Sequence, residues 1–392
     1  MHVLLLSPQP FLVDRGTPIA VRAVVTTLCE NGHTVDLASF HGGRDVSIRG
    51  MRHFRIGQPP LVGNVPIGLS CQKLVCNLWL LALAFRLLRR GRYDCIHAVE
   101  DSVFLALLLR RFAPVPVIYD MDSIMSDQIA EKWPALGRLA RGLRRIERVA
   151  MRASDLIICV CPALASRAAD DAPATAQVVL HDYPLWNDGA GAPSIRTGGD
   201  PGRLVALYVG NLQPYQGVDL LTDAVRLLPA GLKLDLVIVG GLPEDAGRAV
   251  ERSARDESGI RIRFLGPMPL EWLPGLVLQG DILLSPRRQG VNTPMKIYTY
   301  MMAARAILAT SIPSHTQVLD ESCALLVSPT AAAIAAGLEH LAVDPGRRER
   351  LGTAARHKAE TCYSKARYDA ILLGAYDRLH LPTSGTLCTH PD

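Results

Sequence analysis

Short apolar runs alternate with amphipathic helical patterns from the N-terminus to about Leu180. The run Val3–Leu6 is followed by a helical pattern over Thr17–Asn31 and by a second apolar run over Thr34–Phe40. Further predicted strands are Cys95–His97, Val115–Tyr119 and Leu156–Val160, and further predicted helices are Cys71–Arg90, Ser102–Phe112 and about Leu136–Met151. Because strands that alternate with helices usually pair in parallel, this half is predicted to be an α/β domain with a doubly wound sheet.

The alternation stops and then starts again. Residues 187–203 are rich in glycine, proline and polar residues, which is typical of an interdomain linker. Beyond them the predicted strands are Leu204–Val209, Lys233–Val239, Ile262–Leu265, Ile282–Leu284 and Ala306–Ala309, and the predicted helices are Val218–Leu228, Ala246–Asp256, a helix within Thr293–Ala304, and closing helices from Arg347 to about Leu379. A chain of 392 residues exceeds what one hydrophobic core usually serves. We therefore predict two domains, 1–186 and 204–365, and a disordered tail at 382–392, where apolar periodicity is missing.

Several predicted strands of the second half end in glycine. Leu207–Leu221 (LYVGNLQPYQGVDLL) places a glycine loop directly between a strand and a helix, and glycines also end Leu236–Gly241 (LVIVGG) and Phe264–Pro267 (FLGP). In open α/β sheets, ligands bind beyond the carboxyl ends of the strands. The backbone N–H groups of such a loop, together with a helix N-terminus, suit an anion.

The order of these motifs resembles the C-terminal domain of retaining glycosyltransferases of the GT-B fold, family 4 (glycosyl transferases group 1). The segment Asp281–Thr310 is similar to the best-known region of that family, and the loop Ser7–Pro18 and the turn Glu30–Val35 (ENGHTV) resemble its opening. The resemblance spans roughly residues 1–378. It implies two Rossmann-like doubly wound domains that face each other across a cleft, with a helix at 366–381 that crosses back to the N-terminal domain.

The resemblance also implies which residues bind the donor, a nucleotide-sugar. These candidate donor-binding residues are Arg15, Gly16, Thr17, Gly210, Asn211, Gln216, Gly240, Gly266, Gly290, Asn292, Thr293, Pro294, Lys296 and Thr299. Many relatives carry Arg and Lys at the positions of Asn211 and Gln216. Many also carry two glutamates, at the positions of Gln289 or Val291 and of Thr299, so all four charged groups are replaced here. We hypothesise that Arg15 and Lys296 neutralise the donor phosphates instead; Arg287 and Arg288 are further cations nearby.

Two carboxylates, Asp120 and Asp122, follow the predicted strand that ends at Tyr119. Relatives often have a histidine close to the second position, oriented toward the transferred sugar. In retaining transfer the diphosphate oxygen can itself act as the base, so the protein mainly positions groups and stabilises charge. We predict Asp120 and Asp122 as catalytic residues. His97 and Glu100, with Asp101, are candidates for contact with the acceptor.

Each feature also has a structural interpretation. Gly210 fits a plain strand-to-helix turn, the two aspartates and Asn292 or Thr293 fit helix caps, and His97 fits a buried structural histidine. Two alternative functions are also considered for the whole chain. A catalytically degenerate GT-B scaffold that binds a ligand or partner would explain the lost charges. A Rossmann dehydrogenase lacks support, because no GxGxxG motif follows the first strand.

Positive charge is concentrated between Arg49 and Arg152, with 17 Lys and Arg against 8 Asp and Glu. Nucleic-acid motifs are absent, so no nucleic-acid partner is predicted. On the predicted helix near Leu136–Met151, one face carries Arg138, Arg141, Arg145, Arg148 and Arg152, and another carries Leu139, Leu143, Ile146 and Val149–Ala150. The arginine face fits either a solvated surface or docking to an anionic membrane, which would suit a lipid-linked acceptor.

Nine scattered cysteines show no zinc spacing, so we expect reduced thiols, no metal and no cofactor. The N-terminus is too short and uncharged for a signal peptide. No apolar run is expected to cross a membrane, because Asn77 and Arg86 interrupt the nearest one, Leu74–Leu88. Together with the resemblance to family 4, these features imply a cytoplasmic hexosyltransferase, peripheral on the inner face of the membrane, that builds a cell-surface polysaccharide or glycolipid.

Overall fold

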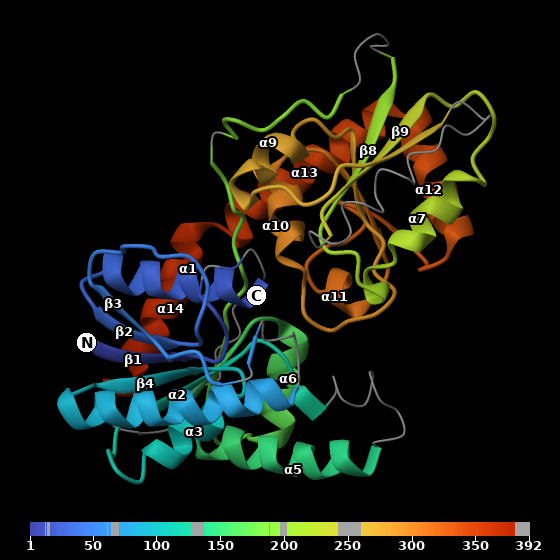
Figure 1. Cartoon of the computed structure of the whole chain (residues 1–392). Helices are drawn as coiled ribbons and strands as arrows, with labels where there is room; N and C mark the ends of the chain where they lie inside the picture. Colours follow the sequence, from blue (N-terminus) through green and yellow to red (C-terminus); the bar gives the residue numbers. More distant parts are fainter. Residues whose placement is uncertain are drawn as a thin grey trace. The chain divides into compact units, whose positions relative to one another are not determined.

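The structure, a computed structural model, describes residues 1–11, 13, 16–60, 62–63, 70–126, 137–187, 189–196, 202–241 and 260–380. The chain folds as two compact units (Figure 1). The first comprises Met1–Leu180 and the C-terminal segment from Tyr368, and the second comprises His181–Arg367. Each unit is built on its own parallel sheet, which confirms the predicted α/β class.

Seven parallel strands form the sheet of the first unit, in the order β3-β2-β1-β4-β5-β6-β7. They are β1 (His2–Ser7), β2 (Thr34–Ser39), β3 (Met51–Arg55), β4 (Cys95–Val99), β5 (Val117–Met121), β6 (Leu156–Cys159) and β7 (Ala176–Val179). The helices are α1 (Gly16–Glu30), α2 (Cys71–Arg90), α3 (Ser102–Leu109), α5 (Gly137–Ala153), α6 (Pro162–Asp171) and α14 (Lys365–Asp377). Central strands such as β1 read as continuous apolar runs because both of their faces are buried.

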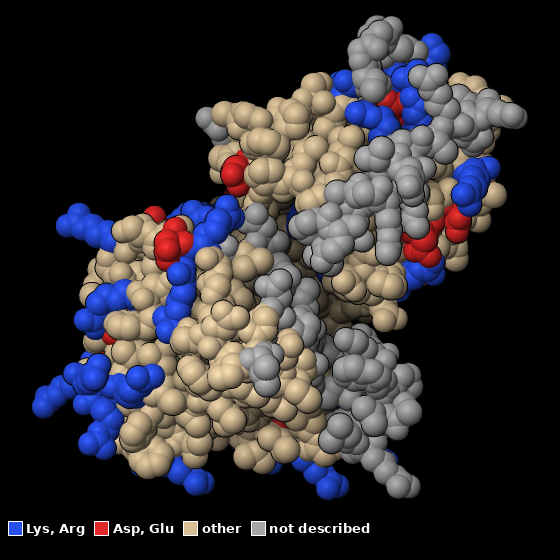
Figure 2. Space-filling view, in the orientation of Figure 1, with Lys and Arg blue, Asp and Glu red and all other residues tan. Residues whose placement is uncertain are grey.

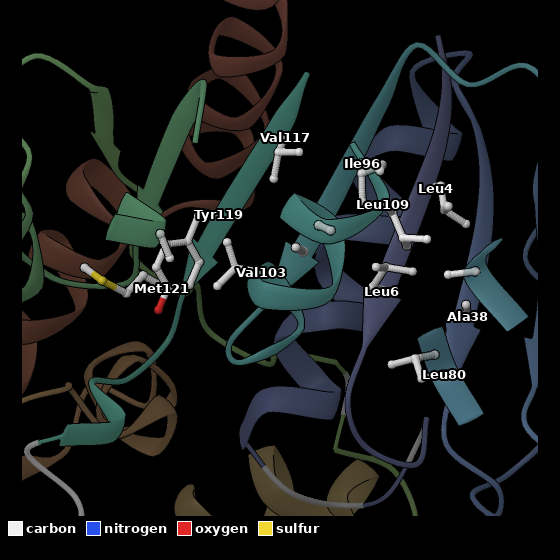
Figure 3. Packing of buried hydrophobic residues seen from close by; sticks show 14 of the residues in the cluster. Leu4, Leu6, Ala38, Leu80, Ile96, Val103, Leu109, Val117, Tyr119 and Met121 are labelled. Atoms are coloured by element: carbon white, nitrogen blue, oxygen red, sulfur yellow. The ribbon is translucent and has the colours of Figure 1, made fainter. Parts of the chain in front are cut away.

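One layer of helices, α2, α3, α5 and α6, packs on a single face of this sheet, and Figure 1 shows α1 on the other side. In the close view of the core, Leu80 of α2 and Val103 of α3 lie over strand residues such as Leu6 and Ile96 (Figure 3). Helix α2 begins where the Ser70 side chain accepts a hydrogen bond from the Lys73 backbone N–H.

The second unit has a six-stranded parallel sheet in the order β10-β9-β8-β11-β12-β13. Its strands are β8 (Leu204–Val209), β9 (Leu234–Val239), β10 (Arg261–Phe264), β11 (Ile282–Ser285), β12 (Ala306–Thr310) and β13 (Leu325–Val327). Its helices are α7 (Val218–Val225), α9 (Leu273–Val277), α10 (Met295–Met302), α11 (Pro313–Thr316), α12 (Ala331–Val343) and α13 (Pro345–Cys362). Two hydrophobic clusters cover the sheet, one containing α10 and α13 residues and one containing α7 and α12 residues.

The segment predicted as a linker, 187–203, is packed on the second unit where the structure describes it. Ile195 is fully buried in the core of that unit. Its N–H donates to Gln279 Oε1 (2.8 Å), and its carbonyl accepts from Arg263 Nη1 (2.5 Å). The part of this segment around Ile195 therefore packs on the second unit. The helix predicted at Ala246–Asp256 and the tail predicted at 382–392 lie outside the described residues.

One prediction about a helix, the apolar face of α5, is wrong in part, although Ala150 of that face is buried. The apolar face expected on α5 included Ile146 and Val149, but these side chains are 54% and 65% exposed, whereas Glu147 and Met151 are buried. Helix α2 is long and apolar enough to cross a membrane, judged by length and composition only. It nevertheless packs four side chains, Cys76, Leu80, Ala84 and Leu87, into the core of the first unit.

Candidate functional site

The second unit collects its glycine loops at the carboxyl ends of β8, β9 and β10. The N–H of Gly210 donates to Val239 O (2.9 Å), that of Gly240 to Gly266 O (2.7 Å), and that of Gly241 to Gly210 O (3.2 Å). A Cβ atom added to Gly240 (φ +124°) would lie 1.9 Å from Gly210 O, so the two loops can approach this closely only without a side chain. Three predicted donor-binding residues, Gly210, Gly240 and Gly266, are therefore brought together.

Lys296, in the first turn of α10, points its ammonium group at this cluster. Its Nζ lies 3.8 Å from the centroid of the Tyr208 ring, and a Cβ added to Gly210 would lie 3.1 Å from it. Nζ is buried and has no hydrogen-bond partner within the part of the chain that the structure describes. Burial lowers the pKa of Lys296 well below its usual value, and the charge of Arg287 lowers it further.

Arg287, which follows β11, is the second buried cation of this cluster. Its Nη1 donates to Asn292 O (2.9 Å), and its guanidinium group lies 5.3 Å from the centroid of the Tyr215 ring. Burial lowers its pKa. Among the described residues, no carboxylate forms a salt bridge with Arg287 or Lys296, so two neighbouring cations are buried without a counter-ion. Such a pair is unfavourable unless an anion binds.

The loop between β11 and α10 shapes this cation pair. Gly290 (φ +137°) lies beside the Arg287 guanidinium, since an added Cβ would be 3.2 Å from Nη1. Thr293 Oγ1 accepts from Gln317 Nε2 (3.0 Å), and Pro294 precedes the first turn of α10. Thr310 Oγ1, from the next strand, donates to Arg287 O (2.6 Å). The predicted residues Gly290, Asn292, Thr293 and Pro294 thus frame Arg287.

The other predicted donor-binding residues of this unit are Asn211, Gln216 and Thr299. Tyr208 Oη donates to Asn211 O (2.6 Å) and lies 3.4 Å from Gln216 Oε1, so Asn211 and Gln216 surround the ring over which Lys296 sits. Gln216 is buried. Thr299 is fully buried, and its hydroxyl accepts a hydrogen bond from the Leu185 N–H (3.2 Å). The Thr299 hydroxyl therefore already has a partner inside the protein. Arg15 lies outside the described residues.

In the first unit, carboxylates gather at the carboxyl ends of β4 and β5. His97 is fully buried between Tyr376 of α14 (Nδ1 to Oη, 2.7 Å) and Asp120 of β5 (Nε2 to Oδ2, 3.1 Å). His97 therefore holds Asp120 in place, and its burial favours the structural interpretation over direct contact with an acceptor. Tyr376 lies 279 positions further along the chain, and no local pattern indicated it.

Asp122 lies beside the start of α1. Thr17 Oγ1 donates to Asp122 Oδ2 (2.5 Å), and Gly16 is the first residue of the helix. Burial raises the pKa of Asp122 to about 6, opposed by the Thr17 hydrogen bond and assisted by Asp120. The structure thus brings together Gly16 and Thr17, predicted for the donor, with Asp122, predicted for catalysis.

Glu100 has the backbone conformation that favours glycine (φ +49°). Its N–H donates to Asp120 O (2.9 Å), and its carboxylate lies 3.7 Å from Lys73 Nζ. Burial raises the pKa of Glu100 to about 7; Lys73 opposes this effect, whereas Asp122, Asp101 and Asp120 add to it. Glu100 is therefore a carboxyl group that can bind or release a proton near neutral pH.

Sequence reasoning missed two members of this cluster. Lys73 Nζ lies 2.6 Å from Asp101 Oδ1, and Asn77 Nδ2 donates to Asp101 Oδ2 (2.7 Å). Burial alone would lower the pKa of Lys73, but Asp101 and Glu100 raise it overall. A signal was present, because Lys73 and Asn77 are polar residues four positions apart in an otherwise apolar helix segment and so share one face. Among the described residues, no group of three His, Cys, Asp or Glu side chains could hold a metal ion.

The arginine face of α5 is partly occupied. Arg148 Nη2 lies 2.9 Å from Asp171 Oδ1, and Arg152 Nε donates to Asp171 O (2.8 Å). Arg141 and Arg145 are exposed, and the Arg138 side chain lies outside the described set. The five predicted arginines are therefore not one continuous free surface.

The raised pKa of Glu100 leads to a prediction about how the stability of the protein depends on pH. Folding favours the protonated form of Glu100. The contribution of Glu100 to the free energy of unfolding is therefore complete below about pH 4.5 and is lost as the pH rises through about 7. We expect Glu100→Gln to be more stable than the wild type by about 1–3 kcal/mol at pH 8 and to lose that advantage toward pH 4.5. Thermal unfolding across this pH range measures the difference. The exposed Glu349→Gln is the control, and a Glu100→Gln effect independent of pH would contradict the prediction.

Comparisons with known proteins match both halves of the chain. Residues 203–344 match a family described as glycosyl transferases group 1, and residues 15–180 match glycosyltransferase family 4. The D-inositol 3-phosphate glycosyltransferase of Thermomonospora curvata is 29% identical over 216 residues, which are 52% of this chain and 50% of that protein. The chain thus aligns with about half the length of this curated relative.

Solved structures are similar over nearly the whole chain. Sucrose-phosphate synthase from Thermosynechococcus elongatus has a TM-score of 0.77 at 19% identity, covering 96% of this chain and 98% of that one. HepE of Anabaena, in complex with UDP and glucose, has a TM-score of 0.71 at 13% identity (96% and 100%). WaaG, involved in lipopolysaccharide biosynthesis, has a TM-score of 0.69 at 14% identity (96% and 99%). At these low identities, the TM-scores and the coverage establish a shared fold.

Proposed function

Because the chain belongs to the group 1 glycosyltransferases and has their GT-B fold, we propose that it transfers a hexose from a nucleotide-sugar donor with retention of configuration. One observation carries the choice of donor. Lys296 and Arg287 are buried together, without a carboxylate, at the ends of strands that terminate in glycine. A diphosphate supplies the negative charge that this site lacks, and the glycine loops leave room for it against the backbone.

In the proposed reaction, the bond between the anomeric carbon and the diphosphate oxygen breaks while the acceptor hydroxyl attacks from the same face. The acceptor proton passes to the leaving diphosphate oxygen. Lys296 and Arg287 stabilise the charge that develops on the diphosphate, and we propose that no metal or other cofactor is required. Asp122 and Asp120 orient the reacting hydroxyl groups, with His97 fixing Asp120 and Thr17 fixing Asp122.

The donor base and the acceptor class are further parts of the proposal. HepE of Anabaena was solved with UDP and glucose, so UDP-glucose is the first donor to test. The involvement of WaaG in lipopolysaccharide biosynthesis supports a cell-surface glycan or a lipid-linked saccharide as the acceptor. We propose a cytoplasmic enzyme that works at the inner face of the membrane, with exposed Arg141 and Arg145 among its membrane contacts.

A thermal-shift panel tests the donor directly. UDP-, GDP- and ADP-sugars, with the free nucleotides as controls, are added to the full chain, and release of the sugar is measured in parallel. We expect uridine nucleotides to raise the melting temperature by several degrees at saturation, since ligand binding stabilises only the folded state. We also expect slow hydrolysis of the matching sugar nucleotide.

A second candidate is a GT-B scaffold that binds without turnover. The uncharged Asn211 and Gln216, and the internal hydrogen bond of Thr299, favour it over an active enzyme. A nucleotide that stabilises the protein while every sugar nucleotide stays intact, with and without acceptor glycolipids, would support the scaffold. If no nucleotide or sugar nucleotide of the panel raises the melting temperature, both candidates are contradicted.

A further inference from the structure

Exposed apolar side chains are concentrated on one layer of the first unit. Fourteen large hydrophobic side chains are exposed among the residues that the structure describes, and eight of them belong to α2, α3 with its following turn, or α5. These eight, which we call the apolar ridge, are Leu74, Val75, Leu78, Trp79, Leu108, Phe112, Ile146 and Val149. Their exposed fractions range from 38% for Val75 to 67% for Phe112.

The three helices of the ridge are neighbours in one layer. Their inner residues, such as Leu80, Val103 and Ala150, belong to a single core cluster on one face of the sheet. The outer sides are joined by contacts between helices. The rings of Phe85 and Phe112 lie 5.4 Å apart, and Arg110 Nη1, in the turn after α3, donates to Ala153 O of α5 (2.9 Å).

The exposed charged side chains of α2, α3 and α5 have one sign. The sequences of α2 and α3 contain no acidic residue. The one carboxylate of α5, Glu147, is buried and accepts hydrogen bonds from Ser126. Six exposed arginines of these helices and the turn after α3 form no salt bridge with a described carboxylate and no hydrogen bond with α6: Arg86, Arg89, Arg90, Arg111, Arg141 and Arg145. Figure 2 shows the tan surface over α2, with blue Lys and Arg side chains at one end and along the lower edge of the unit.

We infer that the apolar ridge and its arginines dock the first unit onto an anionic lipid bilayer. Exposed leucine and tryptophan beside arginine suit the boundary between headgroups and acyl chains, and positive charge without exposed carboxylates suits anionic lipid. Helix α2 lies along such a surface and does not cross it, because its opposite side is committed to the core through Leu80 and Ala84. Eight exposed large apolar side chains on neighbouring helices are also unusual for a surface that only faces water.

Docking here would bring the carboxylate cluster to the membrane. The ridge begins at Leu74, immediately after Lys73, which binds Asp101 and lies 3.7 Å from Glu100. The first turns of α2 therefore lie at the edge of the sheet that carries Asp120 and Asp122. This step rests on the proposed function: the headgroup of a lipid-linked acceptor would reach that edge without leaving the bilayer.

Vesicle co-sedimentation of the full chain tests the surface. Vesicles of phosphatidylcholine alone are compared with equal parts phosphatidylcholine and phosphatidylglycerol, at low and high salt. We expect binding to the mixed vesicles, weakened by salt, and at least about tenfold weaker binding for Leu74→Ser/Leu78→Ser/Trp79→Ser and for Arg141→Gln/Arg145→Gln. Leu227→Ser/Val343→Ser, which alters two exposed apolar residues of the second unit, is the matched control and should bind as the wild type does.

Three outcomes would overturn the inference. They are failure of the wild type to bind mixed vesicles, equal binding by the triple variant, and a dimer in light scattering that the triple variant abolishes. Melting temperatures show that each variant is folded. Donor hydrolysis without vesicles separates this inference from the proposed function, because loss of vesicle binding with unchanged hydrolysis concerns the docking surface only.

Discussion

Replacing Lys296 with methionine is expected to make the protein more stable and, at the same time, to lower kcat/KM for the nucleotide-sugar at least about a hundredfold. The stability gain follows from the buried ammonium group, which has no hydrogen-bond partner among the described residues and lies near a second cation, Arg287. Methionine fills similar space without this desolvation cost, so we expect a gain of about 1–3 kcal/mol. The activity loss follows from removing one of two cations that stabilise the leaving diphosphate.

The pH dependence of the stability gain has a definite sign. The folded state lowers the pKa of Lys296, so the wild type is penalised most at low pH, where the buried amine must carry its charge. The penalty shrinks as the pH rises and disappears above the ordinary lysine pKa of about 10.4. The advantage of Lys296→Met in thermal unfolding should therefore decrease from neutral toward alkaline pH.

Calorimetry gives an independent test of the same site. A diphosphate that binds beside Lys296 raises its pKa, so the wild type should take up protons when UDP binds. Titrations in buffers of different ionisation enthalpy measure this uptake, which should be absent in Lys296→Met. Arg288→Met is the control, because Arg288 is partly exposed and paired with Asp219. If Lys296→Met retains donor turnover and proton uptake, this site does not hold the diphosphate.

The parts of the fold that local patterns could predict were those with long apolar runs. Strands β1, β8 and β9 follow from runs such as Val3–Leu6 and Leu236–Gly241, because a buried parallel strand must be apolar on both faces. The short strands β3, β7 and β13 are partly exposed at sheet edges, and so they lack such a run. The described part of 187–203 packs on the second unit through one buried residue, Ile195, in spite of the glycines and prolines around it.

The candidate site was predictable where its residues follow strand ends, and not where distant segments meet. Gly210, Gly240, Asp120 and Asp122 could be placed because loops after parallel strands share one edge of a sheet. Lys296 could be proposed as a phosphate-binding cation, but its burial without a counter-ion could not be read from the sequence. Family membership, established by matches to both halves, also sets aside the dehydrogenase alternative.

Helix α5 shows why a helical periodicity can be assigned to the wrong face. Arginines and apolar residues recur on adjacent stripes, and the sequence alone suggests that the apolar stripe is buried. In the structure, Asp171 of α6 binds Arg148, while Ile146 and Val149 are exposed. Ion pairs with another helix therefore help to determine which face of α5 is buried. A local sequence pattern cannot predict such pairs.

The second large effect is expected for Gly240→Ala. A Cβ atom at this position would lie 1.9 Å from Gly210 O, closer than real atoms approach, so the loops after β8 and β9 must separate. The backbone at Gly240 (φ +124°) is also one that alanine rarely adopts. Together these effects should lower the free energy of unfolding by about 3–5 kcal/mol.

Gly231→Ala separates the two causes. Gly231 also has a positive φ (+90°), but an added Cβ would have no atom within 4 Å, so only backbone strain of about 1 kcal/mol is expected. Calorimetric unfolding of both variants measures the difference, and the nucleotide panel reports whether the donor site survives. Equal destabilisation by the two variants would mean that the contact between Gly210 and Gly240 is not as close as the structure has it. A larger loss in Gly240→Ala, accompanied by weaker UDP binding, would show that this contact shapes the anion site, because Lys296 Nζ lies against the same glycine, Gly210.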